Sequence, residues 1–172
     1  MKKVVLYIAT SLDGYVATKD GGVTWLDEFN TVPNVDYGYS KFTNSIDTVV
    51  QGNTTYQQFK DKHIGKNSYV FSQGIATPMD DGVTFVKGGT RKFVDNLDEK
   101  THHNIWLVGG PNLLASFLNE GQVDELIIFI MPILLGDGIP LFTNLETTPN
   151  ILLQSTKAYE NGVVELRYVI KK

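Results

Sequence analysis

The sequence predicts an α/β fold in which helices cover both faces of a mainly parallel β-sheet and an antiparallel C-terminal hairpin completes one edge. Two observations lead to this prediction. Short runs rich in Val, Ile, Leu and Phe alternate with segments of helical periodicity over most of the chain. Residues 152–170 instead hold two strand-like runs separated by Asn161 and Gly162. Both of these residues adopt positive φ readily, so they predict a two-residue hairpin turn.

Each predicted strand is a short β-rich run bounded by glycine or polar residues. The strands are expected at Val4–Ile8, Thr48–Gln51, Ser68–Phe71, Val83–Val86, Ile105–Val108 and Asp124–Ile130. Residues 10–22 are predicted to form a loop, because glycine, aspartate and threonine interrupt that segment. The helices are expected at Asp36–Asn44, Thr55–Lys60, Arg91–Leu97 and Pro111–Leu118. In the last of these, apolar residues recur at helical spacing, and a proline fits the first turn because it lacks an N–H.

Composition narrows the class of protein. The 172 residues suit a single domain, 1–172, and an apolar fraction of 42% is enough to form a core. The net charge of −4 without a basic run argues against a nucleic-acid surface. The absence of cysteine excludes disulfides, thiolate metal sites and cysteine nucleophiles. The apolar run after Lys3 is too short for a signal peptide, and no run is long enough to cross a membrane, so a cytoplasmic protein is expected.

Two strand-to-helix turns share one design. The segments "VVQGNTTY" (49–56) and "LVGGPNLL" (107–114) each place glycine after a strand and before a helix. Helix N-termini carry unpaired N–H groups and partial positive charge, which suit phosphate. Two such turns in one parallel sheet point to a ligand with a diphosphate bridge or with separated phosphates. Each glycine on its own can equally serve only to permit a tight turn.

Five segments in order resemble the dihydrofolate reductase-like superfamily, and most closely the family of the C-terminal reductase domain of the bifunctional riboflavin-biosynthesis protein. They are "LYIATSLDGYVA" (6–17), "DYGYSKFTNSIDTVVQGNTTYQQF" (36–59), "YVFSQ" (69–73), "IWLVGGPNLLASFLNEGQVDEL" (105–126) and "IMPILLGDGIPLF" (130–142). The resemblance implies a dihydrofolate reductase-like fold and binding of NADPH, with NADH as an alternative, along the C-terminal ends of the strands. It further implies an NADPH-dependent reductase of a heterocycle or a ribosylaminopyrimidine, as in riboflavin synthesis.

The resemblance also implies which residues hold the cofactor. Gly109 and Gly110 match a glycine pair that lies against the diphosphate and is often joined by a cis peptide bond in the family. Asn53 stands where many relatives carry a basic residue for the 2′-phosphate of NADPH, and Lys87 or Arg91 can supply that charge instead. The full set of expected cofactor-binding residues is Ala9, Val16, Gly52, Asn53, Thr54, Thr55, Ser72, Gln73, Lys87, Val108, Gly109, Gly110, Pro111, Asn112, Leu113 and Leu114.

The substrate side rests on fewer residues. Asp36 resembles the carboxylate that helps protonate the pterin in dihydrofolate reductases, and an apolar cleft would raise its pKa. It can also serve only as a helix cap. Asp13 and Trp25 are expected on the substrate side, with a turn aspartate and a core aromatic as the simpler interpretations. Tyr15 replaces a lysine of several relatives, which weakens the case for a phosphorylated ribose.

The remaining chemistry-bearing residues predict no site. His63, His102 and His103 lack the spacing of a metal pair and are expected at the surface. No serine lies in a G-x-S-x-G context, so a hydrolase is not expected. The alternatives to the leading function are dihydrofolate reduction and a dinucleotide-binding module without turnover. A homodimer is expected through the apolar segment "DELIIFIMPILL" (124–135), unless that strand is buried within one subunit.

Overall fold

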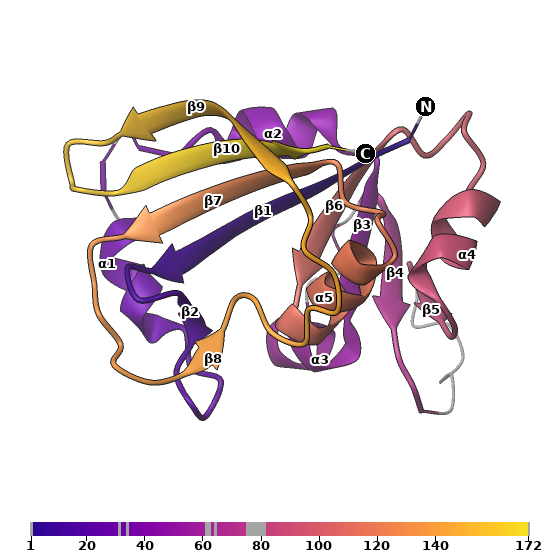
Figure 1. Ribbon diagram of the computed structural model, residues 1–172, viewed down its shortest axis with the longest axis horizontal. Helices are drawn as coiled ribbons and strands as arrows, with labels where there is room; N and C mark the ends of the chain where they lie inside the picture. Colours follow the sequence, from indigo (N-terminus) through magenta and orange to yellow (C-terminus); the bar gives the residue numbers. More distant parts are fainter. Residues whose placement is uncertain are drawn as a thin grey trace.

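An eight-stranded β-sheet, ordered β5-β4-β3-β6-β1-β7-β10-β9, forms the centre of the computed structural model (Figure 1). The structure describes residues 2–30, 32–33, 35–60, 63, 65–74 and 82–171. The strands from β5 to β7 run parallel, whereas β10 is antiparallel to both β7 and β9. The strands are β1 Lys3–Ser11, β3 Thr48–Gly52, β4 Asn67–Phe71, β5 Val83–Val86, β6 Asn104–Gly109, β7 Glu125–Met131, β9 Ile151–Ala158 and β10 Val164–Ile170. The predicted fold class is confirmed.

Helices cover both faces of the sheet because alternate residues of each strand point to opposite sides. On one face, Leu6 of β1 shares a core cluster with Leu114 and Phe117 of α5 (Pro111–Asn119), and α4 (Thr90–Asn96) lies beside α5. On the other face, Val5 shares a cluster with Phe29 of α1 (Asp27–Asn30) and with Phe42 of α2 (Tyr39–Ser45). The short helices η1 (Thr24–Leu26) and α3 (Asn53–Phe59) complete the set. None of the helices in the described part of the chain combines the length and the apolar character that crossing a bilayer requires.

Several element boundaries differ from the sequence-based expectation for local reasons. Helix α2 begins at Tyr39 and not at Asp36, because the Asp36 carboxylate accepts hydrogen bonds from the backbone N–H groups of Gly38 (2.9 Å) and Ser40 (3.3 Å) ahead of the first turn. The segment expected to be a loop contains a short strand, β2 (Tyr15–Ala17), which pairs with β8 (Ile139–Pro140). That pairing is invisible to local patterns, since the two strands lie over 120 residues apart.

The hairpin turn between β9 and β10 was predicted with the wrong geometry. The N–H of Tyr159 donates to the carbonyl of Val163 (2.8 Å), and the N–H of Gly162 donates back to Tyr159 (2.9 Å). The loop therefore has three residues, with Gly162 at φ +87°. The side chain of Asn161 is used instead for a tertiary contact, donating to the Tyr37 hydroxyl at 2.6 Å.

The strand expected at a dimer edge lies inside the sheet. β7 pairs with β1 on one side and with β10 on the other, and five of its seven residues are buried. The sheet edge on this side is β9, in which every residue is exposed. Ile151, Leu152 and Leu153 of β9 each expose nearly half of their surface. The apolar edge thus exists, but on a different strand from the one predicted.

Candidate active site

Two glycine-containing turns meet where neighbouring parallel strands end. β3 ends at Gly52, and β6, which pairs with it, ends at Gly109. A methyl group placed on Gly52 would lie 3.5 Å from the backbone nitrogen of Gly110, and one placed on Gly110 would lie 3.4 Å from the Thr55 hydroxyl. The Gly109-Gly110 peptide bond is cis, and Gly109 has φ +120°, which side-chain-bearing residues rarely adopt. Gly109 is therefore required for its conformation. At Gly110 and Gly52 an added methyl group would make ordinary contacts, which shows that the two turns lie side by side.

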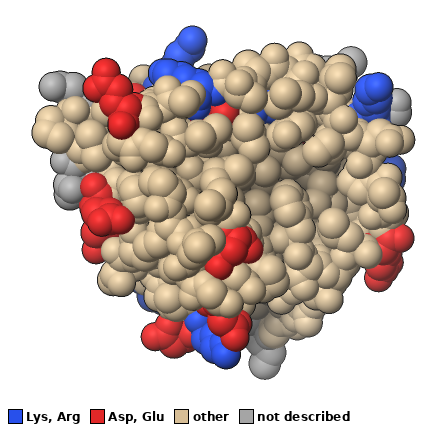
Figure 2. Space-filling view, turned by 60° about the vertical axis from the view of Figure 1, so that its left-hand side comes forward, with Lys and Arg blue, Asp and Glu red and all other residues tan. Residues whose placement is uncertain are grey.

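These turns border a cleft of about 1450 Å³ at the C-terminal ends of the parallel strands. This volume exceeds the ~300–1,000 Å³ of common small-ligand pockets, so the cleft has room for a dinucleotide and a second molecule. Figure 2 looks toward this end of the sheet and shows a hollowed face on which uncharged residues predominate. The expected cofactor residues that line the cleft are Ala9, Val16, Gly52, Asn53, Thr54, Thr55, Ser72, Gln73, Lys87, Val108, Gly110, Pro111, Asn112 and Leu113.

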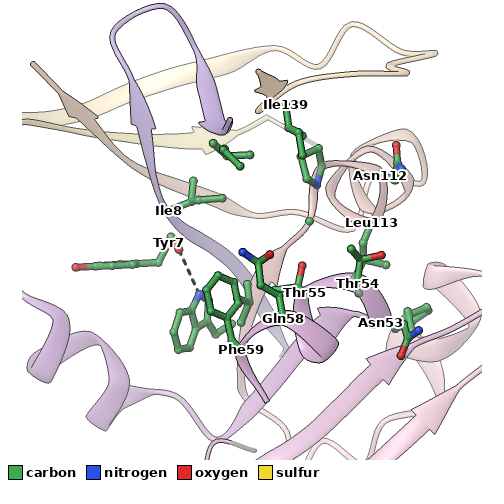
Figure 3. A pocket seen from close by; sticks show the side chains of 18 of the residues that line it. Tyr7, Ile8, Asn53, Thr54, Thr55, Gln58, Phe59, Asn112, Leu113 and Ile139 are labelled. Carbon is green, nitrogen blue, oxygen red and sulfur yellow. Dashed lines mark hydrogen bonds between the residues drawn. The ribbon is translucent and has the colours of Figure 1, made fainter. Parts of the chain in front are cut away.

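The N-terminal turn of α5 offers fewer free amides than expected. Pro111 has no N–H, and the N–H groups of Leu113 and Leu114 both donate to the carbonyl of Gly110 at 3.0 Å. Leu114 also differs from the prediction in position, because its side chain is 1% exposed in the core and does not line the cleft. The backbone N–H of Asn112 does not donate to that carbonyl. Asn112 and Leu113 both line the cleft (Figure 3).

At the β5 end of the cleft, one acidic residue joins the predicted set. Lys87 and Glu120 both line the cleft there, beside Ser72 and Gln73. The Glu120 carboxylate accepts a hydrogen bond from the Thr90 hydroxyl at 2.8 Å and another from the backbone N–H of Arg91. The Arg91 guanidinium donates to the carbonyl of Glu120 and is not among the lining residues. Of the two cations considered for a 2′-phosphate, the structure brings only Lys87 to the cleft.

Glu120 was missed by the sequence analysis, although a helical pattern identifies it. Asn112, Ser116 and Glu120 follow one another at intervals of four along and just beyond α5, and all three line the cleft. They form a stripe along the side of the helix that faces away from the buried Leu114. A polar stripe that begins at the glycine turn was therefore the available signal.

The opposite end of the cleft is aromatic. Tyr7 of β1 lies with its ring centroid 4.8 Å from that of Phe129 and 6.4 Å from that of Trp106, and all three line the cleft. The Trp106 indole N–H donates to the Tyr7 carbonyl at 3.3 Å (Figure 3). Burial raises the pKa of Tyr7 well above its ordinary value, and its hydroxyl donates to the Tyr37 carbonyl at 3.1 Å. The Tyr7 side chain is therefore an uncharged part of the cleft lining at physiological pH.

Helix α3 connects the two ends of the cleft. Its first residues, Asn53–Thr55, lie at the glycine turns, and Gln58 and Phe59 lie toward Tyr7 (Figure 3). The Gln58 amide donates to the carbonyl of Gly21 at 2.8 Å and so ties α3 to the loop after β2. Because Gly21 also lines the cleft, this contact encloses one of its sides.

Asp36 lies at the cleft, but its ionisation differs from the expectation. Hydrogen bonds from the backbone of Gly38, followed by those from Ser40, lower the pKa of Asp36, and the side chain is exposed. The raised pKa expected of an acid in an apolar cleft is therefore wrong. Asp36 is a carboxylate at neutral pH, with the capping role described above.

Asp13 and Trp25 do not line the cleft. The Asp13 carboxylate accepts hydrogen bonds from the Ser11 hydroxyl (2.6 Å) and from the N–H groups of Leu135 (3.2 Å) and Gly136 (2.7 Å). These hydrogen bonds, above all the one from the Ser11 hydroxyl, lower the pKa of Asp13. Asp13 thus joins two loops. Trp25 packs against the core cluster that contains Phe29 and Phe129, as its simpler interpretation predicted.

The histidines are dispersed, but one of them is not at the surface. His102 is 9% exposed, and its ring nitrogens are within 3.0 Å of the Tyr69 hydroxyl and 2.7 Å of the Thr101 hydroxyl. It is a hydrogen-bonded structural residue, which corrects the expectation of an exposed one. His63 packs edge-on against Trp106 with ring centroids 5.2 Å apart. Within the described residues, no three His, Asp or Glu side chains group as metal ligands do.

Comparison with known proteins agrees with this architecture. The family model for the RibD C-terminal domain matches residues 48–165. Uncharacterized protein YwjB of Bacillus subtilis (strain 168) is 40% identical over 173 residues, covering 98% of this chain and 98% of its own. A solved structure from Shewanella sp. PV-4, provisionally named a riboflavin biosynthesis protein, has a TM-score of 0.89 at 30% identity over 99% of both chains.

Dihydrofolate reductase from Enterococcus faecalis, solved with NADP(H) and RAB-propyl, shares the fold. Its TM-score is 0.72 at 13% identity, over 99% of this chain and 97% of its own. The match to the family model extends over most of the chain, from β3 to β10, and includes both glycine turns. The chain therefore belongs to the RibD C-terminal domain family.

Proposed function

We propose that the protein is a pyridine-nucleotide-dependent reductase that transfers a hydride to a flat heterocycle. The observation that carries the proposal is the contact between the two glycine turns at the middle of a long cleft. Bare backbone and the Thr54 and Thr55 hydroxyls line this point, which suits a diphosphate bridge. The cleft extends from it in two directions, toward Lys87 and toward Tyr7, as an extended dinucleotide requires.

The residues present fit such a cofactor. The Thr54 and Thr55 hydroxyls and the Asn112 amide would donate hydrogen bonds to phosphate oxygens. Ser72, Gln73 and Lys87 would hold the adenosine part at the β5 end. Ala9, on the same face of β1 as Tyr7, would leave room for the nicotinamide ring against the sheet. NADP(H) in the dihydrofolate reductase of the same fold supports this class of cofactor. When bound, the cofactor supplies the hydride.

The chain's own part in the reaction is alignment and exclusion of water. The Tyr7, Trp106 and Phe129 rings would hold a planar acceptor, and the Gln58–Gly21 hydrogen bond would keep the neighbouring loop against it. Asp36, as a carboxylate, would accept a hydrogen bond from an N–H of the acceptor and so orient it. The family supports a ribosylaminopyrimidine of riboflavin synthesis as the first candidate acceptor, and the dihydrofolate reductase of the same fold supports a dihydropterin as the second.

A titration tests the proposal. In a Trp25→Phe background, Trp106 is the remaining tryptophan, and it lines the cleft. Adding NADPH or NADH should quench its fluorescence in a saturable way. The dihydronicotinamide absorbance should then fall when a pyrimidine or pterin acceptor is added. Saturable binding without oxidation across a broad acceptor panel would favour a dinucleotide-binding module, and no binding of either cofactor would refute the proposal.

We also propose a homodimer formed through the exposed edge of β9. A long, apolar edge strand exposes unpaired backbone groups, which pair readily with a second copy. All eight residues of β9 are exposed, and its first three are apolar.

A further inference from the structure

The aromatic end of the cleft has a surface composition that restricts its ligand. Tyr39 and Phe59 line it and expose 45% and 51% of their surface, next to Trp106, which is buried. The Tyr39 and Trp106 ring centroids lie 6.0 Å apart and nearly perpendicular, at 76°. Large exposed aromatic surfaces grouped in one concave site are typical of binding sites for flat apolar or aromatic groups. The shape and composition of this end favour a planar ring system.

Positive charge is confined to the other end of the cleft. Lys87 is the one lysine or arginine among the described lining residues, and it follows β5. β5 is separated from β1 by β4, β3 and β6. At about 4.8 Å per strand, the end of β5 lies roughly 19 Å from β1, which carries Tyr7, and roughly 14 Å from β6, which carries Trp106. Both distances exceed the Debye length of about 8 Å at physiological ionic strength, so salt largely screens any attraction between Lys87 and an anion held at the aromatic end.

Two lysines near the aromatic end are engaged elsewhere, and a third, Lys41 of α2, is exposed and does not line the cleft. Lys19, on the loop after β2, forms an ion pair with Asp137 at 2.5 Å. Lys60, which follows Phe59, directs its ammonium group over the Tyr56 ring at 5.4 Å from the centroid. The charged lining residue at the aromatic end is the Asp36 carboxylate. A phosphate dianion bound there would face this carboxylate and the electron-rich faces of several rings. Arg167 of β10 is the cation whose charge also reaches Tyr7, but it is paired with the Glu165 carboxylate, whose charge acts on Tyr7 in the opposite sense.

We propose that the hydride acceptor is a planar heteroaromatic molecule that carries no phosphate and is neutral or positively charged. The proposal rests on the proposed function and specifies its substrate class. The exposed rings of Tyr39 and Phe59 would pack against the flat ring system, and Asp36 would favour a ring N–H or a cation. The preference against phosphate distinguishes this site from one that takes a phosphoribosyl group.

Two matched ligand pairs test the proposal. The first is 5-amino-6-(ribosylamino)uracil with its 5′-phosphate, and the second is riboflavin with its 5′-phosphate; within each pair only the phosphate differs. Calorimetry in the presence of saturating oxidised cofactor gives a dissociation constant for each ligand without turnover. In at least one pair, the member without phosphate should bind at least tenfold more tightly.

The outcomes are separable from a failure of the proposed function. Equal or tighter binding of the phosphorylated members would overturn the substrate class while leaving cofactor binding intact. No binding of any of the four ligands would also overturn it, because a flat heteroaromatic molecule would then not be the ligand. Absence of cofactor binding, measured separately, would instead refute the proposed function.

A charge substitution probes the physical cause. Phe59 lines the aromatic end and is half exposed, so Phe59→Lys places an ammonium group there without disturbing the core. Phe59→Met is the matched control that removes the ring without adding charge. Relative to Phe59→Met, Phe59→Lys should improve binding of the phosphorylated member at least tenfold and leave the other member within threefold. An unchanged ratio would show that charge does not cause the discrimination and would overturn the proposal.

Discussion

Replacing Gly110 with valine tests the central geometry of the cleft. Gly110 has φ −75° and ψ −171°, which any residue adopts, so valine does not strain the backbone dihedrals there. Its Cβ would lie 3.4 Å from the Thr55 hydroxyl, the limit of ordinary contact. The two γ-methyl groups would reach about 1.5 Å further and occupy the space between the glycine turns and a phosphate.

The expected loss follows from the hydrogen bonds that the phosphate would forfeit. A hydrogen bond to a charged group contributes about 1.5–3 kcal/mol, so losing one or two of them weakens dinucleotide binding by about 3 kcal/mol. This corresponds to roughly a hundredfold increase in Kd. Gly110→Ala, which adds the Cβ alone, should weaken binding by less than about tenfold. Fluorescence titration of Trp106 measures both variants, with circular dichroism as the check on folding.

The neighbouring glycine provides a contrast. Gly109 lies at φ +120°, so Gly109→Ala imposes backbone strain of about 1–3 kcal/mol and should lower the melting temperature before it affects binding. A folded Gly110→Val variant that binds NADPH and NADH within threefold of the wild type would refute the placement of the diphosphate at these turns.

Four further predictions concern the cofactor, the acceptor, the oligomer and stability. Asn53→Arg should increase the preference for NADPH over NADH at least tenfold in KM ratios, because a guanidinium pairs with the 2′-phosphate. Asp36→Asn should raise the KM for the acceptor more than it lowers kcat, and the wild-type pH–rate profile should show no group of raised carboxylate pKa, since hydrogen bonds from Gly38 lower the pKa of Asp36. Sedimentation should give twice the mass of the chain, and Leu152→Lys in β9 should give a monomer; a wild-type monomer would contradict the dimer. Burial raises the pKa of Asp47, but hydrogen bonds led by that from the Asn104 N–H (3.0 Å) outweigh it and hold the pKa below its ordinary value. Asp47→Ala should therefore lower the free energy of unfolding by about 1–2 kcal/mol at pH 7, and urea titrations should show this difference shrinking as the pH falls below about 4, where the wild type protonates.

Local patterns were sufficient where a segment's own residues decide its structure. The strand Val83–Val86 was predicted with its observed bounds, and the helix that begins at Pro111 differs by one residue at its end. These segments have strong apolar periodicity and clear breakers at their boundaries. The start of α2 was predicted three residues too early, because a side-chain cap at Asp36 resembles a helical residue in sequence.

The site was predicted in part for the same reason. The glycine turns are recognisable from their own residues, and the resemblance to the family identified the cofactor-binding residues next to them. Most of these residues line the cleft. Tyr7 and Trp106 were not identified, because nothing in their own segments distinguishes a cleft wall from a core aromatic. Leu114 was included by adjacency, although a helical step of 100° turns it into the core.

The sequence alone determined the fold class, the family and the two glycine turns, since each follows from patterns within single segments and from the order of those segments along the chain. Only the tertiary structure decided that the two turns touch, that Glu120 and not Arg91 faces the cleft, and that β9 forms the edge of the sheet. The features that only the structure decided are matters of strand order and side-chain direction. They depend on pairings between segments 120 or more residues apart, and local propensities carry no information about such contacts.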